Sequence, residues 1–543
     1  MWNPLISGAR AFLLPTLLPL LLVPTAGART DAQVWAVLYN GAGNGDDVAR
    51  DIASDGAGNV YVTGYSAGDG TDMDFVTIKY SPAGEELWVR FYDGPSSGED
   101  IATTLGLDAG GNIFVAGYSQ GDGTGYDFAT IKYDSSGVQQ WVCRYDGPDG
   151  DASDKATALA VDETGSVCVT GTSDANWATV RYSPQGDELW VRRFEHYGSN
   201  EPRAITVDGE ESVYVTGTVW GSVNTDFMTI KYDSTGAPRW EQQHGHGDIT
   251  ISDGGNDIIM DPGGACVYVT GWGGGPSAQL DFITIRYNAT SGAQQWLKSY
   301  HALSSSWNSA QAMAWDNQGN IIIAGSSSPP YDYTTLSYNT SGTLRWVRQY
   351  SGPVGVDHAR DLAADGEGNA YVTGNSLGDG TGDDITTLMY DTEGSQVWES
   401  RYNGPGNGAD QPRAITVDPD GNVCVTGYCL GISSGLDIVT ILYDQETGVP
   451  ESGNPPVVTS LRSPAPNPSS GPVRVFFELP AAEAVDLAVY DLAGRRRITL
   501  VSEAVPAGSH QAVWDSGEAP PGCYLVVLRT ERETLTRTFV LIE

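Results

Sequence analysis

The chain has 543 residues and a formal net charge of -39. This length is too great for one ordinary compact core, so it predicts several domains or a repeat architecture. The acidic surplus excludes nucleic acid and anionic membrane surfaces as expected partners, because their phosphates would repel the chain at long range. The 68 glycines, with short runs rich in Thr and Val, favour an all-β protein rich in turns.

The first 28 residues have the pattern of a cleaved secretory signal. Arg10 precedes an apolar run over 11–23, and Ala26, Gly27 and Ala28 supply small residues at the expected cleavage point. A membrane anchor is the weaker interpretation, because three prolines interrupt a run that is already short for crossing a bilayer. We therefore expect an exported mature chain with no transmembrane segment.

Residues 31–449 repeat one unit eight times. A Tyr-Val-Thr-Gly-like run occurs first at 60–64 and last at 423–427, and an Asp-Phe-Val-Thr-Ile-Lys-Tyr-like run ends first at Tyr80 and last at Tyr443. A tryptophan recurs at intervals of 49 to 56 residues, at Trp35, Trp88, Trp141, Trp190, Trp240, Trp296, Trp346 and Trp398. This period suits one four-stranded blade per unit and predicts an eight-bladed β-propeller. We expect each tryptophan to be buried between neighbouring blades.

Each unit supplies four strands, named a to d from the propeller axis outwards. Strand a is typified by residues 51–53, strand b by Tyr-Val-Thr-Gly, strand c by the run that ends in Tyr, and strand d by the tryptophan. The first recognisable strand, around Trp35, is of type d, whereas the last, ending at Tyr443, is of type c. We therefore expect the N-terminal strand to complete the eighth blade and close the ring, which leaves no open sheet edge.

One polar residue stands at the start of every strand a, eight residues before the Asp that ends it. In a closed ring these residues should face one mouth of the central channel as six carboxylates and two amides, whose mutual repulsion requires compensation. Backbone amides would make the ring structural, whereas a bound ligand or cation would make it a site. The sequence favours the structural alternative. If there is a ligand site, it is predicted at this ring: Asp47, Asp100, Asp154, Asn200, Asp253, Asn308, Asp357 and Asp410.

Three of the loops between strands b and c are rich in oxygen-bearing side chains. They read Gly-Asp-Gly-Thr at 68–71, 121–124 and 378–381. Such loops could hold calcium, the one cofactor that the sequence suggests, although none has the terminal bidentate Glu of an EF-hand. The candidate ligands are Asp69, Asp72, Asp122 and Asp379.

The sequence contains no recognisable catalytic motif. There is no nucleophile elbow, phosphate-binding loop or HExxH helix, so no catalytic residue is predicted. Of the six cysteines, Cys168, Cys266 and Cys424 replace core residues of other repeats, and no disulfide framework is evident. A bridge between Cys424 and Cys429 remains open.

The C-terminal part differs in pattern from the repeats. A linker rich in Pro and Gly spans 450–460, and residues 461–543 alternate as short strands. A small β-sandwich is the natural fold for such a segment. The predicted organisation is therefore a signal peptide over 1–28, a propeller over 31–449, the linker, and the sandwich.

The repeat resembles the bacterial SBBP β-propeller repeats over residues 31–449. The tail, with Val489-Tyr490-Asp491-Leu492-Ala493-Gly494 and Gly522-Cys523-Tyr524, is similar to FlgD-type immunoglobulin-like domains and to the C-terminal sorting domains of type IX secretion cargo. The resemblance implies a secreted protein associated with the bacterial cell surface and outer membrane. It also implies that the C-terminal domain contacts the secretion machinery.

Two classes of function are compatible with these patterns. The favoured one is a non-enzymatic binding or structural scaffold with an unknown protein or glycan ligand. The alternative is an enzyme at the channel mouth, either similar to quinone-dependent dehydrogenases or acting as a polysaccharide lyase or glycosidase. The missing quinone ligands and the lack of a distinct acid and base weigh against the alternative. Fold alone does not separate the two classes.

Overall fold

The computed structural model describes three parts of the chain. They are residues 29–30; residues 33–444 except 69–71, 97, 151, 199, 222–223, 246–250, 275–278, 303–306, 329–330, 379 and 433; and residues 460–461, 473–479, 483–505, 508–514, 519–530, 532 and 534–541. The predicted signal peptide and most of the linker lie outside these residues. Over the described part, no helix is long and apolar enough to cross a membrane.

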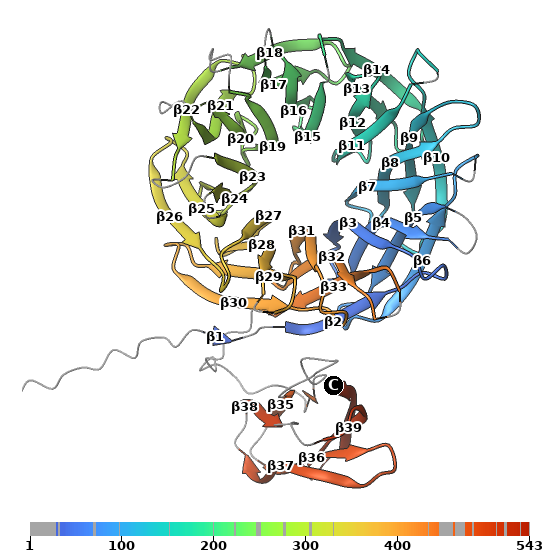
Figure 1. Cartoon of the computed structure of the whole chain (residues 1–543), viewed down its shortest axis with the longest axis vertical. Helices are drawn as coiled ribbons and strands as arrows, with labels where there is room; N and C mark the ends of the chain where they lie inside the picture. The colour runs from blue at the N-terminus through green and yellow to red at the C-terminus, as the bar shows by residue number, and fades with distance from the viewer. Residues whose placement is uncertain are drawn as a thin grey trace, which may run out of the picture.

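The structure is all-β, and four-stranded antiparallel sheets stand around a central axis as the blades of a β-propeller (Figure 1). Strands of type a are β3 (Asp47–Ser54), β7 (Asp100–Leu107), β11 (Asp154–Val161), β15 (Glu201–Val207), β19 (Gly254–Met260), β23 (Trp307–Trp315), β27 (Asp357–Ala364) and β31 (Gln411–Val417). Strands of type b are β4 (Val60–Ala67), β8 (Ile113–Gln120), β12 (Val167–Ser173), β16 (Val213–Trp220), β20 (Cys266–Gly274), β24 (Asn320–Ser328), β28 (Ala370–Leu377) and β32 (Val423–Leu430).

The outer half of each blade is built from types c and d. Strands of type c are β5 (Met73–Tyr80), β9 (Tyr126–Tyr133), β13 (Asn176–Tyr182), β17 (Thr225–Tyr232), β21 (Leu280–Asn288), β25 (Asp332–Asn339), β29 (Asp383–Tyr390) and β33 (Leu436–Tyr443). Strands of type d are β2 (Gln33–Tyr39), β6 (Glu86–Tyr92), β10 (Gln139–Tyr145), β14 (Glu188–Phe194), β18 (Pro238–His244), β22 (Gln294–Tyr300), β26 (Leu344–Tyr350) and β30 (Gln396–Tyr402). Figure 1 shows type a innermost and type d at the rim.

The two ends of the repeat region lie in one sheet. Strand β2 pairs antiparallel with β33, with Trp35 opposite Leu442 and Tyr39 opposite Ile438. The short strand β1 (Arg29–Thr30) instead pairs in parallel with β30, opposite Trp398 and Glu399. The N-terminal segment of the ring therefore contacts two neighbouring sheets.

The repeated tryptophans fasten each sheet to the next one. Trp35 is 7% exposed, and its indole nitrogen donates to the Pro82 carbonyl at 3.1 Å. Gly84 closes the same turn with φ of +79°, and a Cβ there would stand 2.9 Å from Cδ2 of Trp35. The same indole-to-turn hydrogen bond recurs at Trp141, Trp190, Trp240, Trp296 and Trp346. The packing role is confirmed, but full burial holds only for Trp35, Trp190, Trp240, Trp346 and Trp398, because Trp88, Trp141 and Trp296 are half-buried.

The Asp that ends each strand a holds the following turn. In the first repeat, Oδ1 of Asp55 accepts from the backbone amides of Ala57 and Asn59, and its Oδ2 accepts from the hydroxyl of Tyr61 at 2.8 Å. These contacts lower the pKa of Asp55 against the opposing effect of its burial. The carboxylate of Asp55 therefore has a structural role in stabilising the turn.

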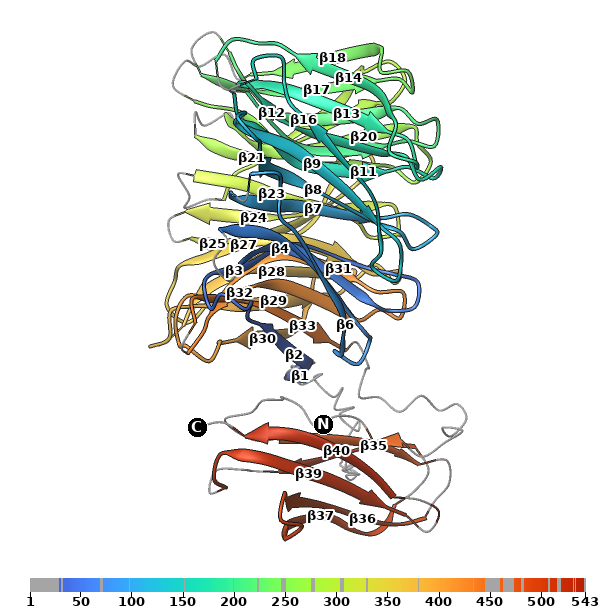
Figure 2. The ribbon, with the colours of Figure 1, turned by 90° about the vertical axis from the view of Figure 1, so that its right-hand side faces the viewer.

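The C-terminal strands form two further antiparallel sheets, drawn apart from the blades in Figure 2. One contains β34 (Ser460–Leu461), β35 (Val473–Leu479) and β38 (Gly508–Trp514), and the other β37 (Arg496–Val505), β36 (Glu483–Asp491), β39 (Gly522–Arg529) and β40 (Thr534–Leu541). Both sheets contribute to one apolar core, which includes Phe477, Trp514, Val526 and Phe539.

All six cysteines are free thiols, so Cys424 and Cys429 are not bridged. Cys168, Cys266 and Cys424 are buried, as expected for substitutes of core residues. Burial raises the pKa of Cys143 to about 11 and that of Cys168 to about 12. Such thiols are protonated at neutral pH and therefore unreactive.

Candidate functional site in the central channel

The residues that precede or begin each strand a form a first set, here called the strand-start ring. All eight side chains are completely buried: Asp47, Asp100, Asp154, Asn200, Asp253, Asn308, Asp357 and Asp410. Their side chains are therefore not exposed to the water of the channel.

Loop amides satisfy much of the strand-start ring. Oδ2 of Asp154 accepts from the Gly147 amide at 2.6 Å, and Oδ2 of Asp357 accepts from the Gly352 amide at 2.7 Å. Asp410 accepts two amides and, mainly because of burial, its pKa is raised to about 6. This is the compensation that the structural alternative requires. A ligand-binding role for the ring stays a prediction.

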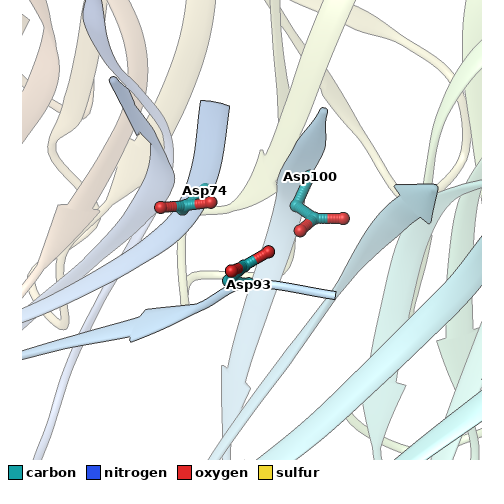
Figure 3. Close-up of side chains that lie close together, drawn as sticks. All are labelled: Asp74, Asp93 and Asp100. Atoms are coloured by element: carbon teal, nitrogen blue, oxygen red, sulfur yellow. The ribbon is translucent and has the colours of Figure 1, made fainter. Parts of the chain in front are cut away.

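Two members of the ring join compact groups of carboxylates. Asp74, Asp93 and Asp100 each place one carboxylate oxygen within 4.8 Å of the other two (Figure 3). Asp74 is the second residue of β5, Asp93 directly follows β6, and Asp100 is the first residue of β7. Burial raises the pKa of Asp100, and the charge of Asp93 raises it further. The group has the hard oxygen donors that a divalent cation prefers.

The second group is the counterpart of the first, one repeat later. Asp127, Asp146 and Asp154 satisfy the same distance criterion. Here Nη2 of Arg144 donates to Oδ2 of Asp127 at 2.7 Å and supplies a positive charge from within the protein. The matching position of the first repeat is Phe91. The two groups therefore differ at this position, and both have the oxygen donors of a candidate cation site.

The predicted calcium loops are only partly described. Asp69 and Asp379 lie outside the described residues, whereas Asp72 and Asp122 are exposed. Neither exposed residue belongs to the two carboxylate groups found in the described part of the chain. Calcium binding by these loops stays a prediction.

A second set of residues lies three positions after each member of the strand-start ring, at a β-bulge that every strand of type a contains. In β3 the pairing passes from Ala49 opposite Gly64 to Asp51 opposite Thr63, which leaves Arg50 as the extra residue. The same shift occurs in the other strands of type a. We call this set the bulge ring: Arg50, Thr103, Thr157, Arg203, Asn256, Gln311, Arg360 and Arg413.

The repeated glycine of strand b makes the bulge possible. A Cβ on Gly64 would stand 2.0 Å from the carbonyl oxygen of Val48 and 2.9 Å from Cα of Ala49. No side chain can occupy that space unless the backbone moves. A bulge redirects the side chain of its extra residue, and in this protein it does so beside the channel.

The bulge ring lines a cavity of about 840 Å³ in the channel. The cavity wall includes five members of the ring, namely Thr103, Thr157, Arg203, Asn256 and Gln311. It also includes Lys155 and Glu201, each of which directly follows a member of the strand-start ring. Ala152, Ser153, Asp174 and Ala175 also line it, so it lies towards the end at which strands of type a begin.

The two cationic side chains of this wall, Lys155 and Arg203, lie over aromatic rings. The ammonium group of Lys155 lies 4.5 Å from the ring centroid of Tyr118 and 4.4 Å from that of Tyr126. The guanidinium of Arg203 lies 5.1 Å from the ring of Trp272 and bonds to Glu201 at 2.8 Å. Such rings hold the cations by cation–π attraction and leave polar atoms for a guest. This arrangement suits a polar ligand with ring-shaped or charged groups.

Sequence reasoning located the strand-start ring but missed the bulge ring. The signal was present, because the bulge position is polar in every repeat although its neighbours in strand a are mostly small or apolar. The repeated strand glycine was a second signal, since a glycine inside a strand often marks a bulge.

Comparison with known proteins supports the propeller repeat family. The SBBP family model, described as a beta-propeller repeat, matches residues 34–70 and 345–380. Each match starts in a strand of type d and runs through the next strands of types a and b. No curated protein matches the chain in sequence.

Several solved structures are similar to this chain. They include PorZ, a surface component of the type IX secretion system of Porphyromonas gingivalis, at 14% identity and a TM-score of 0.41 over 94% of this chain and 70% of that one. The periplasmic gluconolactonase PpgL of Pseudomonas aeruginosa matches at 14% identity and a TM-score of 0.40 over 74% of this chain and 98% of that one. Drosophila Plexin A, solved with Semaphorin 1b, matches at 8% identity and a TM-score of 0.38 over 77% of this chain and 88% of that one.

Proposed function

We propose that the chain is a secreted or bacterial cell-surface scaffold, associated with the outer membrane, which binds a glycan or protein ligand at the mouth of its propeller channel. Residues 1–28 act as the signal peptide, 31–449 form a closed eight-bladed propeller, and 450–460 link it to an immunoglobulin-like sandwich. That sandwich, residues 461–543, serves sorting or anchoring and contacts the secretion machinery.

Closure of the ring is supported by the pairing of β2 with β33. Trp35 of β2 also bonds to the turn after β5, as the other tryptophans bond to the turns of their neighbours. A closed ring has no free sheet edge, which suits a rigid scaffold exposed outside the cell.

The cavity of about 840 Å³ is the observation that carries the binding function. Its volume lies in the range of ligand pockets, and polar bulge residues from several blades line it. The side chains of Thr103, Thr157 and Asn256 also donate to backbone carbonyls of the neighbouring strands. A binding scaffold needs such convergent groups, whereas an enzyme also needs a reactive set with assigned roles.

A cavity-filling variant tests this proposal. Thr157→Trp would place a large ring in the cavity, whereas Glu86→Trp, on the exposed edge of β6, is the matched control. We expect the mature chain to bind members of an array of neutral and acidic oligosaccharides or a panel of surface proteins, and Thr157→Trp to abolish that binding while Glu86→Trp retains it. Equal binding by both variants would place the ligand outside the channel and contradict the proposal.

A deletion tests the proposed sorting role. In a host with a type IX secretion system, the full chain is expected in the surface and medium fractions. A chain that lacks 461–543 should accumulate in the periplasm. Equal surface display of the two chains would contradict the role of the C-terminal domain.

A further inference from the structure

Three arginines of the bulge ring stand on neighbouring innermost strands. Arg360 lies on β27, Arg413 on β31 and Arg50 on β3, and β31 contacts both of the other strands. These strands form the arc of the channel opposite β11 to β19, whose residues line the cavity (Figure 1). Arg50 and Arg413 are half-buried and Arg360 is exposed.

The charges of Arg50 and Arg360 act on the guanidinium group of Arg413. The pKa of Arg413 is lowered, first by burial and then by the positive charges of Arg50 and Arg360, although the nearby Tyr428 opposes this effect. Like charges held together at a partly desolvated site destabilise the folded protein unless a counter-charge offsets them.

No carboxylate of the described residues forms an ion pair with Arg50, Arg360 or Arg413, although the chain carries 68 acidic residues. The adjacent Asp51 and Asp361 are directed elsewhere. Oδ2 of Asp51 accepts from the Leu105 amide at 2.8 Å, and Oδ2 of Asp361 accepts from the Ile415 amide at 2.9 Å.

The contacts that the three arginines do make are to neutral groups. Arg50 lies 5.5 Å from the ring centroid of Tyr65, and Arg413 lies 5.3 Å from that of Tyr428. Nε of Arg360 donates to Oδ1 of Asn375 at 3.1 Å. The amide nitrogen of Asn375 in turn donates to Asp383, so the Asp383 carboxylate reaches Arg360 only through the side chain of Asn375. The Nε atoms of Arg50 and Arg413 are buried and have no hydrogen-bond partner in the part of the chain that the structure describes.

Arg203 is the internal comparison. It occupies the same bulge position on β15 but pairs with Glu201 at 2.8 Å and lies over Trp272. At the bulge position, the isolated arginine thus has a carboxylate partner, whereas the three adjoining arginines have none among the described residues. Unsatisfied buried Nε atoms also occur at Arg181, Arg193 and Arg286, so it is the adjacency of three arginines, rather than the unsatisfied Nε alone, that distinguishes the cluster.

We propose that Arg50, Arg360 and Arg413 form a binding site for an oxyanion, namely a carboxylate, sulfate or phosphate group of the ligand that enters the channel. Guanidinium groups match such groups with paired, charge-assisted hydrogen bonds. Tyr65 and Tyr428 flank the cluster and offer ring faces to the remainder of the ligand. The inference rests on the proposed channel function, because both place a ligand in the channel. It adds that this ligand carries a negatively charged group.

Titration of the mature full chain tests the inference. Inorganic phosphate, sulfate and a glucuronate oligosaccharide are the probes, each at constant ionic strength set with chloride, and a neutral glucose oligosaccharide is the matched sugar. We expect saturable binding of at least one oxyanion by calorimetry and a rise in the unfolding temperature. Phosphate or sulfate binding alone would indicate an inorganic anion or phosphoryl ligand, whereas preference for the glucuronate would indicate an acidic glycan.

Charge-matched variants identify the site. Arg413→Gln should weaken oxyanion binding about tenfold or more, because it removes charge-assisted hydrogen bonds. Arg239→Gln removes the same charge on the outer strand β18, away from the cavity wall, and should change the affinity by less than about twofold. Without an oxyanion, Arg413→Gln should unfold at the same or a higher temperature than the wild type, which separates lost binding from lost folding.

Two results would overturn the inference. One is the absence of saturable binding by every oxyanion probe, and the other is equal weakening by Arg413→Gln and Arg239→Gln. The outcome is separate from that of the proposed function. If an array ligand binds the wild type and Arg413→Gln equally but not Thr157→Trp, the channel function stands and the oxyanion site is wrong.

Discussion

The strand-start ring and the bulge ring lie three residues apart on the same strands, yet their side chains differ in burial and in hydrogen-bond partners. Members of the strand-start ring are fully buried, and loop amides bind their carboxylates. Members of the bulge ring line the cavity or are arginines that form no ion pair among the described residues. In this acidic protein the carboxylates of the strand-start ring are thus bonded to the scaffold, and the bulge ring is where we propose that a ligand binds.

The largest expected effect comes from the glycine that permits the bulge. In Gly427→Ala the new Cβ would stand 2.1 Å from the backbone oxygen of Gln411, beside the bulge that holds Arg413. We expect a loss of at least about 3 kcal/mol in the free energy of unfolding, because backbone atoms must move. Urea unfolding measures it.

The control for this variant is Gly209→Ala, since a Cβ there meets no atom within 4 Å. It should unfold within about 1 kcal/mol of the wild type. Equal destabilisation by the two variants would show that the bulge does not depend on the strand glycine.

The next effect concerns the strand-start ring. Asp154→Ala would leave the Gly147 amide without its acceptor and should destabilise the protein by about 2 kcal/mol. Asp154→Asn should cost less, because Asn200 fills the equivalent position and its Oδ1 accepts from the Trp220 amide. The comparison uses thermal and urea unfolding. A stable Asp154→Ala variant that loses ligand binding would reverse the roles assigned to the two rings.

The residue after the bulge predicts a pH dependence. Burial raises the pKa of Asp361 to about 7, and that of Asp51 and Asp257 to about 6. Because the folded pKa exceeds that of the unfolded chain, the folded state holds more protons between the two values. The contribution of these groups to stability is thus present at low pH and is lost as pH rises through 6 to 7.

Asp361→Asn tests this sign. The variant keeps the oxygen that accepts from Ile415 but has no proton to lose. We expect a smaller fall in unfolding temperature between pH 5 and pH 8 than in the wild type, measured by calorimetry in buffers of equal ionic strength. An unchanged difference would refute the assignment.

The smallest effect is expected outside both rings. Asp122 is exposed in its loop, so Asp122→Ala should change stability by less than about 0.5 kcal/mol in the presence of a chelator. The calcium response of the wild type tests the loop prediction separately. A calcium-induced rise in unfolding temperature that Asp122→Ala removes would assign calcium to this loop. A rise that Asp93→Asn removes would assign it to the carboxylates of Figure 3.

Sequence periodicity predicted much of the fold because it depends on repeated local contacts. The tryptophan, the turn glycine such as Gly84 and the turn Asp such as Asp55 each act within one repeat or between neighbours, so their recurrence is visible in the chain. The strand pattern around β3 to β6 follows from the same residues.

The candidate site was less predictable because it depends on the direction in which each side chain leaves its strand. Simple alternation cannot place Arg50 correctly, since the bulge shifts the register between Ala49 and Asp51. The clustering of Arg50 with Arg360 and Arg413 also joins residues from distant parts of the chain. Their proximity requires the circular arrangement of the blades.

The most direct test of the account is a crystal structure of the mature chain soaked in selenate, whose anomalous scattering locates the anion. The account predicts a selenate peak within hydrogen-bond distance of Arg50, Arg360 and Arg413 in the wild type, and its loss in Arg413→Gln. The strand-start ring should remain bonded to loop amides in both crystals. A channel without selenate at the arginines, together with a ligand or cation held by Asp47 and Asp410, would contradict it.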